Sequence, residues 1–215
     1  MKIKNKSFKD KSKKWLKRHV DDEFVQKSIS DNYRSRAAYK LIEIIDKYKI
    51  LDGVKNVIDL GSAPGSWCQV LKNRGIGLNS IIAVDILEMT GIKGITFYQS
   101  DFLSLEFEKI SKTIGEFDIV LSDISPNLSG NKVSDFLLSK DLLENALNYS
   151  LQNLNANGHF IAKYFRTGDI SDVLTICKRN FYKVTSFKPK SSRKNSSEIY
   201  LICLRKNNAL IDIIC

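Results

Sequence analysis

The stretch DLGSAPGSWCQVL, from Asp59 to Leu71, decides the fold of this chain. It continues an apolar β-branched run, breaks into small and turn-forming residues between Gly61 and Gly65, and resumes with a helical pattern. Glycine lets a backbone approach a ligand closely, and the amino end of the following helix offers free N–H groups. The stretch therefore predicts a strand, a tight ligand-binding loop and a helix.

Similar β-branched runs recur along the chain, and each predicts a buried strand. They are Asn56–Leu60, Ser80–Ile86, Gly94–Gln99, Phe117–Asp123 and His159–Phe165. A helical pattern over Arg34–Tyr48 precedes them. Because strands alternate with helices, we expect an α/β fold with a mostly parallel sheet covered on both faces.

A second helical pattern fills Ser134–Leu154, between the fourth and fifth runs. We expect a Ser-Asp cap at its start and the pair Asn157-Gly158 at its end. One apolar face is expected to carry Leu137, Leu138, Leu142, Leu143, Ala146 and Leu147.

The last two strand-like runs are FYKVTSFKP (Phe181–Pro189) and SEIYLICLRK (Ser197–Lys206). The seven residues between them, KSSRKNS, are too few for a helical crossover. These runs therefore predict an antiparallel hairpin that completes the sheet.

Length and composition indicate one folded domain. The chain has 215 residues, 43% of them hydrophobic, and 3 prolines, which favours a folded domain over a disordered chain. We expect a basic arm over residues 1–20, a single domain over 21–206 and a tail over 207–215.

No apolar run approaches the roughly 18 residues that a membrane span needs, and the first residues lack the apolar core of a signal peptide. We therefore expect a soluble, cytoplasmic protein, and separately we expect a monomer.

Neither a zinc site nor a disulfide framework is expected. The 4 cysteines form no C-x-x-C pair, and only two histidines could join them as ligands. We therefore predict free buried thiols and no metal site.

The net charge of +10 is concentrated in the arm and points to nucleic acid. A general lysine bias of the composition is the alternative explanation. The arm's basic residues are Lys2, Lys4, Lys6, Lys9, Lys11, Lys13, Lys14, Lys17 and Arg18.

Acidic residues follow two neighbouring strands of the predicted sheet. Asp85 ends the second strand, where an acid commonly accepts hydrogen bonds from ribose hydroxyls. Asp101 follows the third strand, within reach of an adenine amino group. Because the glycine spacing is not the G-x-G-x-x-G of dinucleotide sites, we expect an adenosine ligand without pyrophosphate, namely S-adenosylmethionine. The alternatives are that both acids only cap helices and that Trp67 is only a core aromatic.

Four charged residues are expected at the same edge of the sheet. Asp123 ends the fourth strand, Lys163 lies near the end of the fifth, and Glu198 begins the last strand. Lys40 on the first helix could cover this edge. A lysine in an apolar strand is costly to bury, so Lys163 is expected to be catalytic, with a snorkelling edge lysine as the alternative.

Four motifs in this order and spacing resemble the FtsJ/RrmJ family of ribose 2′-O-methyltransferases. They are RSRAAYKL, DLGSAPGSW, SDISPNLSG and KPKSSRKNSSEIY, and the resemblance covers Ser12 to Lys206. It implies a Rossmann-like S-adenosylmethionine-dependent methyltransferase fold of seven strands, with the last one antiparallel. The chain departs from the family where Ser66 replaces a second glycine, where KYFRTGD follows the fifth strand, and in its last ten residues.

The resemblance also implies the roles of individual residues. The catalytic set falls on Lys40, Asp123, Lys163 and Glu198. With the glycine loop, the expected cofactor-binding residues are Gly61, Pro64, Gly65, Trp67, Asp85, Asp101 and Asp123.

The implied substrate is structured RNA, held by its phosphates on the arm and on Lys188, Lys190, Arg193 and Lys194. The stretch SKKWLKRHVDDEFVQKS resembles the bacterial ribosomal RNA members, which implies a uridine in the A-loop of 23S rRNA on the assembled 50S subunit. Three alternatives remain: a tRNA anticodon-loop ribose methyltransferase, a non-catalytic RNA-binding assembly factor, and a nicotinamide oxidoreductase that lacks the usual fingerprint.

Overall fold

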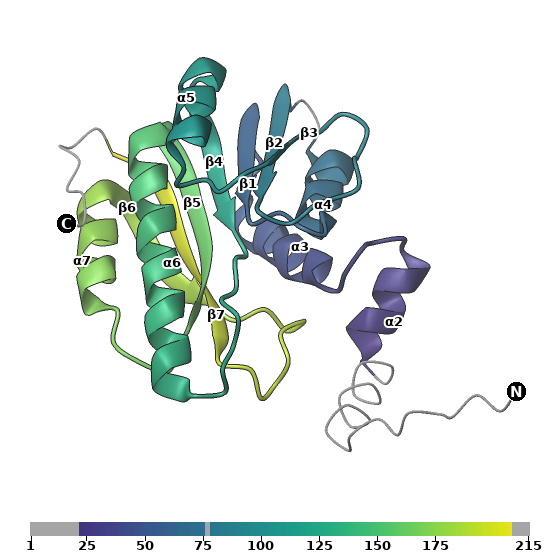
Figure 1. Ribbon diagram of the computed structural model, residues 1–215, viewed down its shortest axis with the longest axis vertical. Helices are drawn as coiled ribbons and strands as arrows, with labels where there is room; N and C mark the ends of the chain where they lie inside the picture. The colour runs from purple at the N-terminus through teal and green to yellow at the C-terminus, as the bar shows by residue number, and fades with distance from the viewer. Residues whose placement is uncertain (1–21, 76–77, 208–215) are drawn as a thin grey trace, which may run out of the picture.

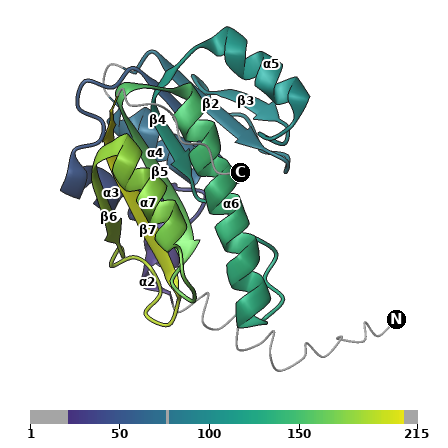
Figure 2. The same ribbon diagram turned by 90° about the vertical axis from the view of Figure 1, so that its left-hand side faces the viewer.

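The structure is a computed structural model that describes residues 22–75 and 78–207. The predicted basic arm, and the predicted tail apart from Asn207, lie outside the described residues. A seven-stranded sheet has helices on both faces (Figures 1 and 2). The strands are β1 Asn56–Leu60, β2 Ser80–Asp85, β3 Thr96–Gln99, β4 Phe117–Ser122, β5 Leu154–Phe165, β6 Phe181–Phe187 and β7 Glu198–Lys206. The helices are α2 Glu23–Ser30, α3 Ala37–Tyr48, α4 Ser66–Arg74, α5 Leu105–Ile114, α6 Lys132–Asn153 and α7 Ser171–Asn180.

The strand order β3-β2-β1-β4-β5-β7-β6 confirms the predicted α/β fold. Neighbouring strands from β3 to β5 are parallel, while β7 runs antiparallel to both β5 and β6. The predicted hairpin is therefore also confirmed. The chain direction across the sheet reverses at β1 and β4, and in such sheets the crevice beyond the strand ends at this point is where ligands bind.

Helix α6 differs from its predicted bounds at both ends. It begins at Lys132, and the side chain of Asn131 caps it by accepting hydrogen bonds from the N–H groups of Val133 and Ser134 at 3.0 and 3.3 Å. It ends at Asn153, and β5 begins with the next residue. The prediction that Asn157-Gly158 ends the helix is wrong. Asn157 takes a φ of 65° inside β5, close to where the register with β4 shifts, because a left-handed residue can bulge a strand as well as end a helix.

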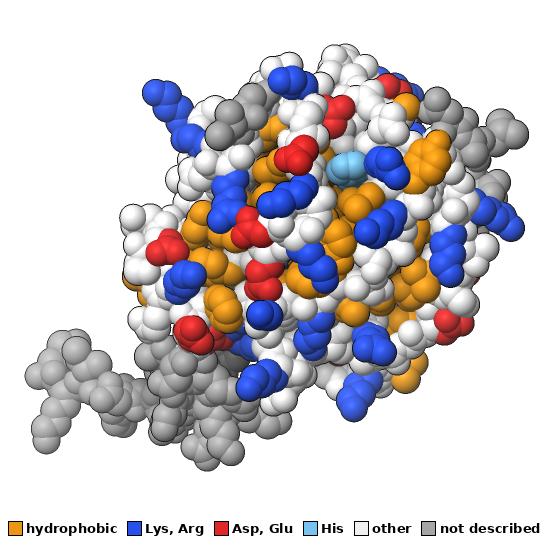
Figure 3. Space-filling model, turned by 180° about the vertical axis from the view of Figure 1, so that it is seen from behind, with side chains coloured by type: hydrophobic (Ala, Val, Ile, Leu, Met, Phe, Trp, Pro, Cys, Tyr) orange, Lys and Arg blue, Asp and Glu red, His pale blue; other side chains and the backbone are white. Residues whose placement is uncertain are grey.

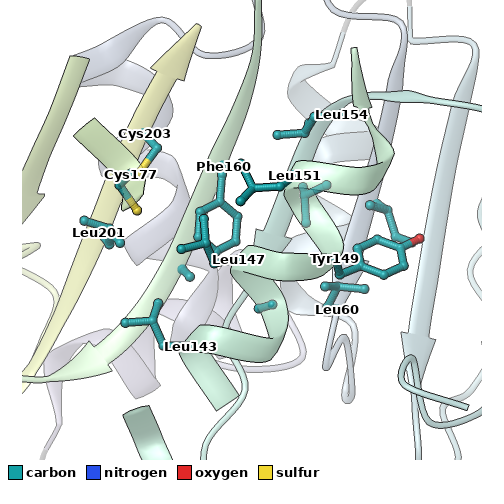
Figure 4. Packing of buried hydrophobic residues seen from close by; sticks show 14 of the residues in the cluster. Leu60, Leu143, Leu147, Tyr149, Leu151, Leu154, Phe160, Cys177, Leu201 and Cys203 are labelled. Carbon is teal, nitrogen blue, oxygen red and sulfur yellow. The ribbon is translucent and has the colours of Figure 1, made fainter. Parts of the chain in front are cut away.

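Two apolar clusters fill the two faces of the sheet. On one face α6 and α7 pack on the strands, with Leu147 against Phe160 and Cys177 beside Cys203 (Figure 4). On the other face α3 and α4 supply the cluster that contains Trp67. The strands between the two clusters are buried on both sides, as their continuous apolar runs predict.

The predicted apolar face of α6 is only partly buried. Leu143, Ala146 and Leu147 are buried, whereas Leu137 and Leu138 are 58% and 49% exposed. The prediction is wrong for these two leucines because the first turns of α6 project beyond the strands, as Figure 2 shows. Within the described residues, no helix combines the length and apolar character that crossing a membrane requires.

Two leucines of α6 provide a matched test of this packing. Leu147→Ala is expected to lower the free energy of unfolding by about 2–5 kcal/mol, because it leaves a cavity in the core. Leu137→Ala removes the same atoms from an exposed position and is expected to cost roughly 0.5 kcal/mol or less. Urea denaturation of both variants checks the difference, and equal losses would contradict the described packing.

Candidate active site

The loop after β1 is built on two glycines with left-handed backbone. Gly61 has a φ of 71°, and an added Cβ there would lie 2.2 Å from Cγ1 of Ile124. Gly65, the N-cap residue of α4, has a φ of 101°, and its added Cβ would lie 2.7 Å from the sulfur of Met89 and 2.9 Å from Nη1 of Arg34. Neither position has room for a side chain, which explains why the loop needs glycine at both.

Carboxylates at the ends of neighbouring strands hold the surrounding loops in place. Asp85 at the end of β2 accepts the N–H of Ala63 and the N–H of Leu87, both at 2.8 Å. Asp101 accepts the N–H of Leu103 at 2.9 Å. Neither acid caps a helix, since Ser104 caps α5, so the helix-cap alternative is wrong. Each carboxylate holds a loop and still has acceptor capacity, because a carboxylate can take about four hydrogen bonds.

Two adjoining cavities open at this edge of the sheet. The larger, of about 520 Å³, is lined by the loops after β1, β2, β3 and β4 and includes Asp85 and Asp101. The smaller, of about 80 Å³, is lined by Pro64 and Trp67 among others. Gly61, Ala63 and Asp123 line both cavities, so the predicted cofactor residues converge here, with the exception of Gly65, which lines neither.

The donor set of the two cavities suits an adenosine ligand with a polar amino-acid end. Ile86, Leu87 and Leu103 give the larger cavity apolar walls suited to a flat ring. In the smaller cavity, Oδ1 of Asp59 and Oγ of Ser62 are buried and have no hydrogen-bond partner within residues 22–75 and 78–207. Buried polar atoms are as a rule hydrogen-bonded, so both atoms fit contact with a polar ligand. S-adenosylmethionine has both an adenosine and an amino-acid end.

Trp67 belongs to the core as well as to the smaller cavity. Its side chain is 2% exposed, and its indole Nε1–H donates to the carbonyl of Ala37 at 2.9 Å. The core alternative is therefore correct, and the predicted cofactor contact is compatible with it. Trp67 fixes the start of α3 against α4 beside the glycine loop.

Lys163 is buried and held by Asp123. Its side chain is 8% exposed, and Nζ donates to the backbone carbonyl of Asp123 at 2.7 Å and lies 3.3 Å from Oδ1 of the same residue. The alternative of a snorkelling edge lysine is therefore wrong. A buried ammonium needs such partners to offset the loss of water.

Asp123 stays ionised at neutral pH because of its neighbours. Burial by itself raises the pKa of a carboxyl, but the ammonium groups of Lys163 and Lys40 and the hydrogen bond from Tyr200 outweigh it. The pKa of Asp123 therefore lies below its ordinary value. This places one fixed negative charge where the two cavities meet.

Lys40 and Glu198 form the second ion pair of the site. Nζ of Lys40 on α3 lies 2.6 Å from Oε2 of Glu198 at the start of β7, with side chains 11% and 12% exposed. The structure thus brings all four predicted catalytic residues to one edge, as a Lys163–Asp123 pair and a Lys40–Glu198 pair.

Tyr200 connects the two pairs, and sequence reasoning missed it. It lies directly opposite Lys163 in the β5–β7 register, and its hydroxyl donates to Oδ1 of Asp123 at 2.7 Å. Its ring centroid lies 5.9 Å from Nζ of Lys40. The available signal was the strand period, because Tyr200 follows Glu198 by two positions and must share its face of the sheet.

The buried Asp59 carboxyl predicts a pH dependence of stability. Burial raises its pKa from 3.8 to about 8, an effect that the Cys68 thiol opposes and the charges of Asp123 and Asp85 strengthen. The folded chain therefore keeps a proton that the unfolded chain has lost between about pH 4 and pH 8, so this stability contribution is lost as pH rises through that window.

Asp59→Asn removes this titration and should gain stability relative to the unsubstituted protein as pH rises from 5 to 8. Urea denaturation without added ligand at both pH values checks this. An unchanged difference between the two proteins would show that Asp59 does not titrate as described.

Comparison with known proteins identifies the family. The sequence profile of the FtsJ-like methyltransferases matches residues 33–206. Two curated relatives share the name ribosomal RNA large subunit methyltransferase E. The one from Rickettsia bellii is 44% identical over 202 residues, which cover 91% of this chain and 89% of that protein. The one from Francisella philomiragia is 46% identical over 196 residues, which cover 89% and 94%.

Solved structures agree with this result. A crystal structure named as a ribosomal RNA methyltransferase from Plasmodium falciparum matches with a TM-score of 0.70 and 35% identity, covering 81% of this chain and 98% of that one. The N-methyltransferase NodS from Bradyrhizobium japonicum, at 14% identity and a TM-score of 0.54, shares the fold alone. This chain belongs to the FtsJ-like methyltransferases, a family whose methyl donor is S-adenosylmethionine.

Proposed function

We propose that this protein methylates the ribose 2′-oxygen of a uridine in the A-loop of large-subunit ribosomal RNA, on the assembled 50S particle. The buried Lys163, held against Asp123 where the two cavities meet, carries the proposal for the chemistry. The names of the relatives from Rickettsia bellii and Francisella philomiragia support the choice of RNA. The proposal includes a cytoplasmic location, because 50S particles assemble in the bacterial cytoplasm, and it keeps the expected monomer.

The proposed cofactor contacts follow from the cavities. Asp85 and Asp101 hold the ribose and adenine, Gly61 and Pro64 border the amino-acid end, and Gly65 shapes the loop without contact. When bound, S-adenosylmethionine supplies a methyl group on a positively charged sulfur. Asp123 lines both cavities, so its negative charge would lie near a ligand that spans them.

In the proposed mechanism, the chain mainly positions the RNA hydroxyl for in-line attack. Lys163 hydrogen-bonds and orients the 2′-hydroxyl, and in its neutral amine form it takes the hydroxyl proton as the oxygen bonds the methyl group. Asp123 and Tyr200 fix Lys163 in place through the contacts described above. Lys40 and Glu198 hold the nucleotide from the side of α3.

A basic surface beside the site is proposed to bind the RNA backbone. Four exposed cations lie on the β6–β7 loop, which leads directly into Glu198: Lys188, Lys190, Arg193 and Lys194. On the face seen in Figure 3, Lys and Arg side chains are scattered among apolar and uncharged ones and outnumber the acids. Phosphate contacts of this kind give affinity without sequence choice.

The substrate is tested with tritiated S-adenosylmethionine and, in separate reactions, 50S particles and total tRNA from a strain that lacks the modification. Label mapped to a uridine ribose of the A-loop is the expected result. Label confined to tRNA would show that the substrate is tRNA rather than ribosomal RNA, and the proposed chemistry would stay the same. No label in either RNA, despite binding of S-adenosylmethionine, would indicate a non-catalytic assembly factor.

Lys163→Ala is expected to abolish methyl transfer and leave cofactor binding largely intact, because Lys163 lines neither cavity and Lys40 and the Tyr200 hydroxyl still support the Asp123 carboxylate. Turnover on 50S particles and isothermal titration with S-adenosylhomocysteine measure the two effects. Lys112→Ala, at an exposed lysine of α5 paired with Glu108, is the matched control. Near-normal turnover of Lys163→Ala would remove Lys163 from the mechanism.

RNA binding should weaken steeply with salt, and the double substitution Lys190→Ala with Lys194→Ala should reduce that dependence. Each lost phosphate contact is expected to lower the slope of log K against log salt by roughly 0.7–0.9. Filter binding over a salt series measures the slope. Lys109→Ala with Lys112→Ala on α5, at the opposite end of the molecule in Figure 1, is the control. Equal slopes for both double variants would exclude the β6–β7 loop as the RNA surface.

A further inference from the structure

The carboxylate of Glu43 on helix α3 holds the β6–β7 loop. Oε2 of Glu43 accepts the N–H of Lys190 at 2.7 Å, and Oε1 accepts the N–H of Ser191 at 2.8 Å. Two consecutive backbone donors on one ionised carboxylate make a strong and directional contact. The loop is thus fixed to α3 seven residues before Glu198 begins β7.

The contact continues from the loop to the catalytic pair. Ser191 is fully buried and Ser192 is 6% exposed, although their neighbours in the loop are exposed. The hydroxyl of Ser192 donates to Oε1 of Glu198 at 2.8 Å. Nζ of Lys40 donates to Oε2 of the same carboxylate at 2.6 Å. Both oxygens of Glu198 are therefore held, one by the loop and one by α3.

Three residues along one side of α3 contact either the β6–β7 loop or Glu198. Arg36, Lys40 and Glu43 are spaced by four and three positions, which places them in a row along the helix. The guanidinium of Arg36 donates to the carbonyl of Ser191. Lys40 lies between two residues that fix the same loop, so the loop position sets the geometry of the Lys40–Glu198 pair.

We propose that Glu43 is a positioning residue for methyl transfer: its hold on the N–H groups of Lys190 and Ser191 orients Ser192 and, through Glu198, the ammonium of Lys40. Glu43 lines neither cavity, so it acts only through the loop. The expected effect of Glu43 on methyl-transfer turnover rests on the proposed function. The same loop exposes the cations proposed to bind RNA, so its position links the RNA surface to the Lys40–Glu198 pair.

Glu43→Gln is the test substitution, because the amide keeps the size but turns one acceptor into a donor that faces a backbone N–H. Turnover at saturating cofactor and 50S is expected to fall roughly tenfold, which is less than the roughly hundredfold loss that a 1 Å misplacement of a reacting group can cause. The affinity for S-adenosylhomocysteine, measured by calorimetry, is expected to stay unchanged. Asp46→Asn is the matched control, because Asp46 lies on the same helix and pairs with Arg74 rather than with the loop.

A second readout needs no substrate. Acetylation of Lys40 by an activated ester, followed by mass spectrometry, reports how firmly the ammonium is held by Glu198. The rate should rise several-fold in Glu43→Gln and in Ser192→Ala and stay unchanged in Asp46→Asn. This measurement decides whether Glu43 holds the pair even if the protein methylates neither 50S nor tRNA, a result that would contradict only the proposed function.

A double-mutant cycle separates positioning from general support of the fold. If Glu43 and Ser192 act through the same carboxylate, the double variant should lose no more turnover than the more affected single variant. Losses that multiply would mean that Glu43 acts elsewhere and would overturn the proposal. An unchanged Lys40 acetylation rate, or unchanged turnover of Glu43→Gln in an active enzyme, would overturn it as well.

Discussion

The ionised carboxylate of Asp123 is the feature on which the arrangement of the site depends. An isolated buried carboxylate would take up a proton, and an ammonium buried beside a neutral acid would have no opposite charge to offset its loss of water. Here Lys163, Lys40 and the Tyr200 hydroxyl together keep Asp123 charged, and its backbone carbonyl also binds Lys163. These groups come from β4, β5, β7 and α3. One charge therefore fixes the relative position of four elements.

The sheet topology makes this convergence possible. The parallel strands β4 and β5 both end at this edge of the sheet, and because β7 is antiparallel to β5 it begins at the same edge. Direct pairing of Phe165 with Glu198 and of Lys163 with Tyr200 then sets the spacing of the charged groups. The glycine loop meets them there because β1 neighbours β4. Backbone pairing supplies the coarse geometry, and the ion pairs supply the fine adjustment.

The sequence was sufficient for features that depend on local pattern. Continuous apolar runs marked the strands, and the edge positions of Asp123, Lys163 and Glu198 followed from strand direction alone. The pattern could not show which ammonium binds which carboxylate, because that depends on side-chain placement across strands. It also missed the contact of Glu43 with Lys190, which are 147 residues apart. Asn157-Gly158 was misassigned because its backbone preference suits both a helix end and a bulge.

The position of β7 within the sheet has a consequence for synthesis of the protein. Among the strands that the structure describes, β7 comes last in the sequence, yet it pairs between β5 and β6 and carries Glu198 and Tyr200. A nascent chain whose β7 is still inside the ribosome has the glycine loop, Lys40 and Lys163 available for folding. It lacks Glu198, the partner of Lys40, and the Tyr200 hydroxyl that donates to Asp123. Domains form as units during translation, and pairings between distant segments form slowly. The candidate site therefore becomes complete only after β7 has left the ribosomal tunnel and paired with β5 and β6.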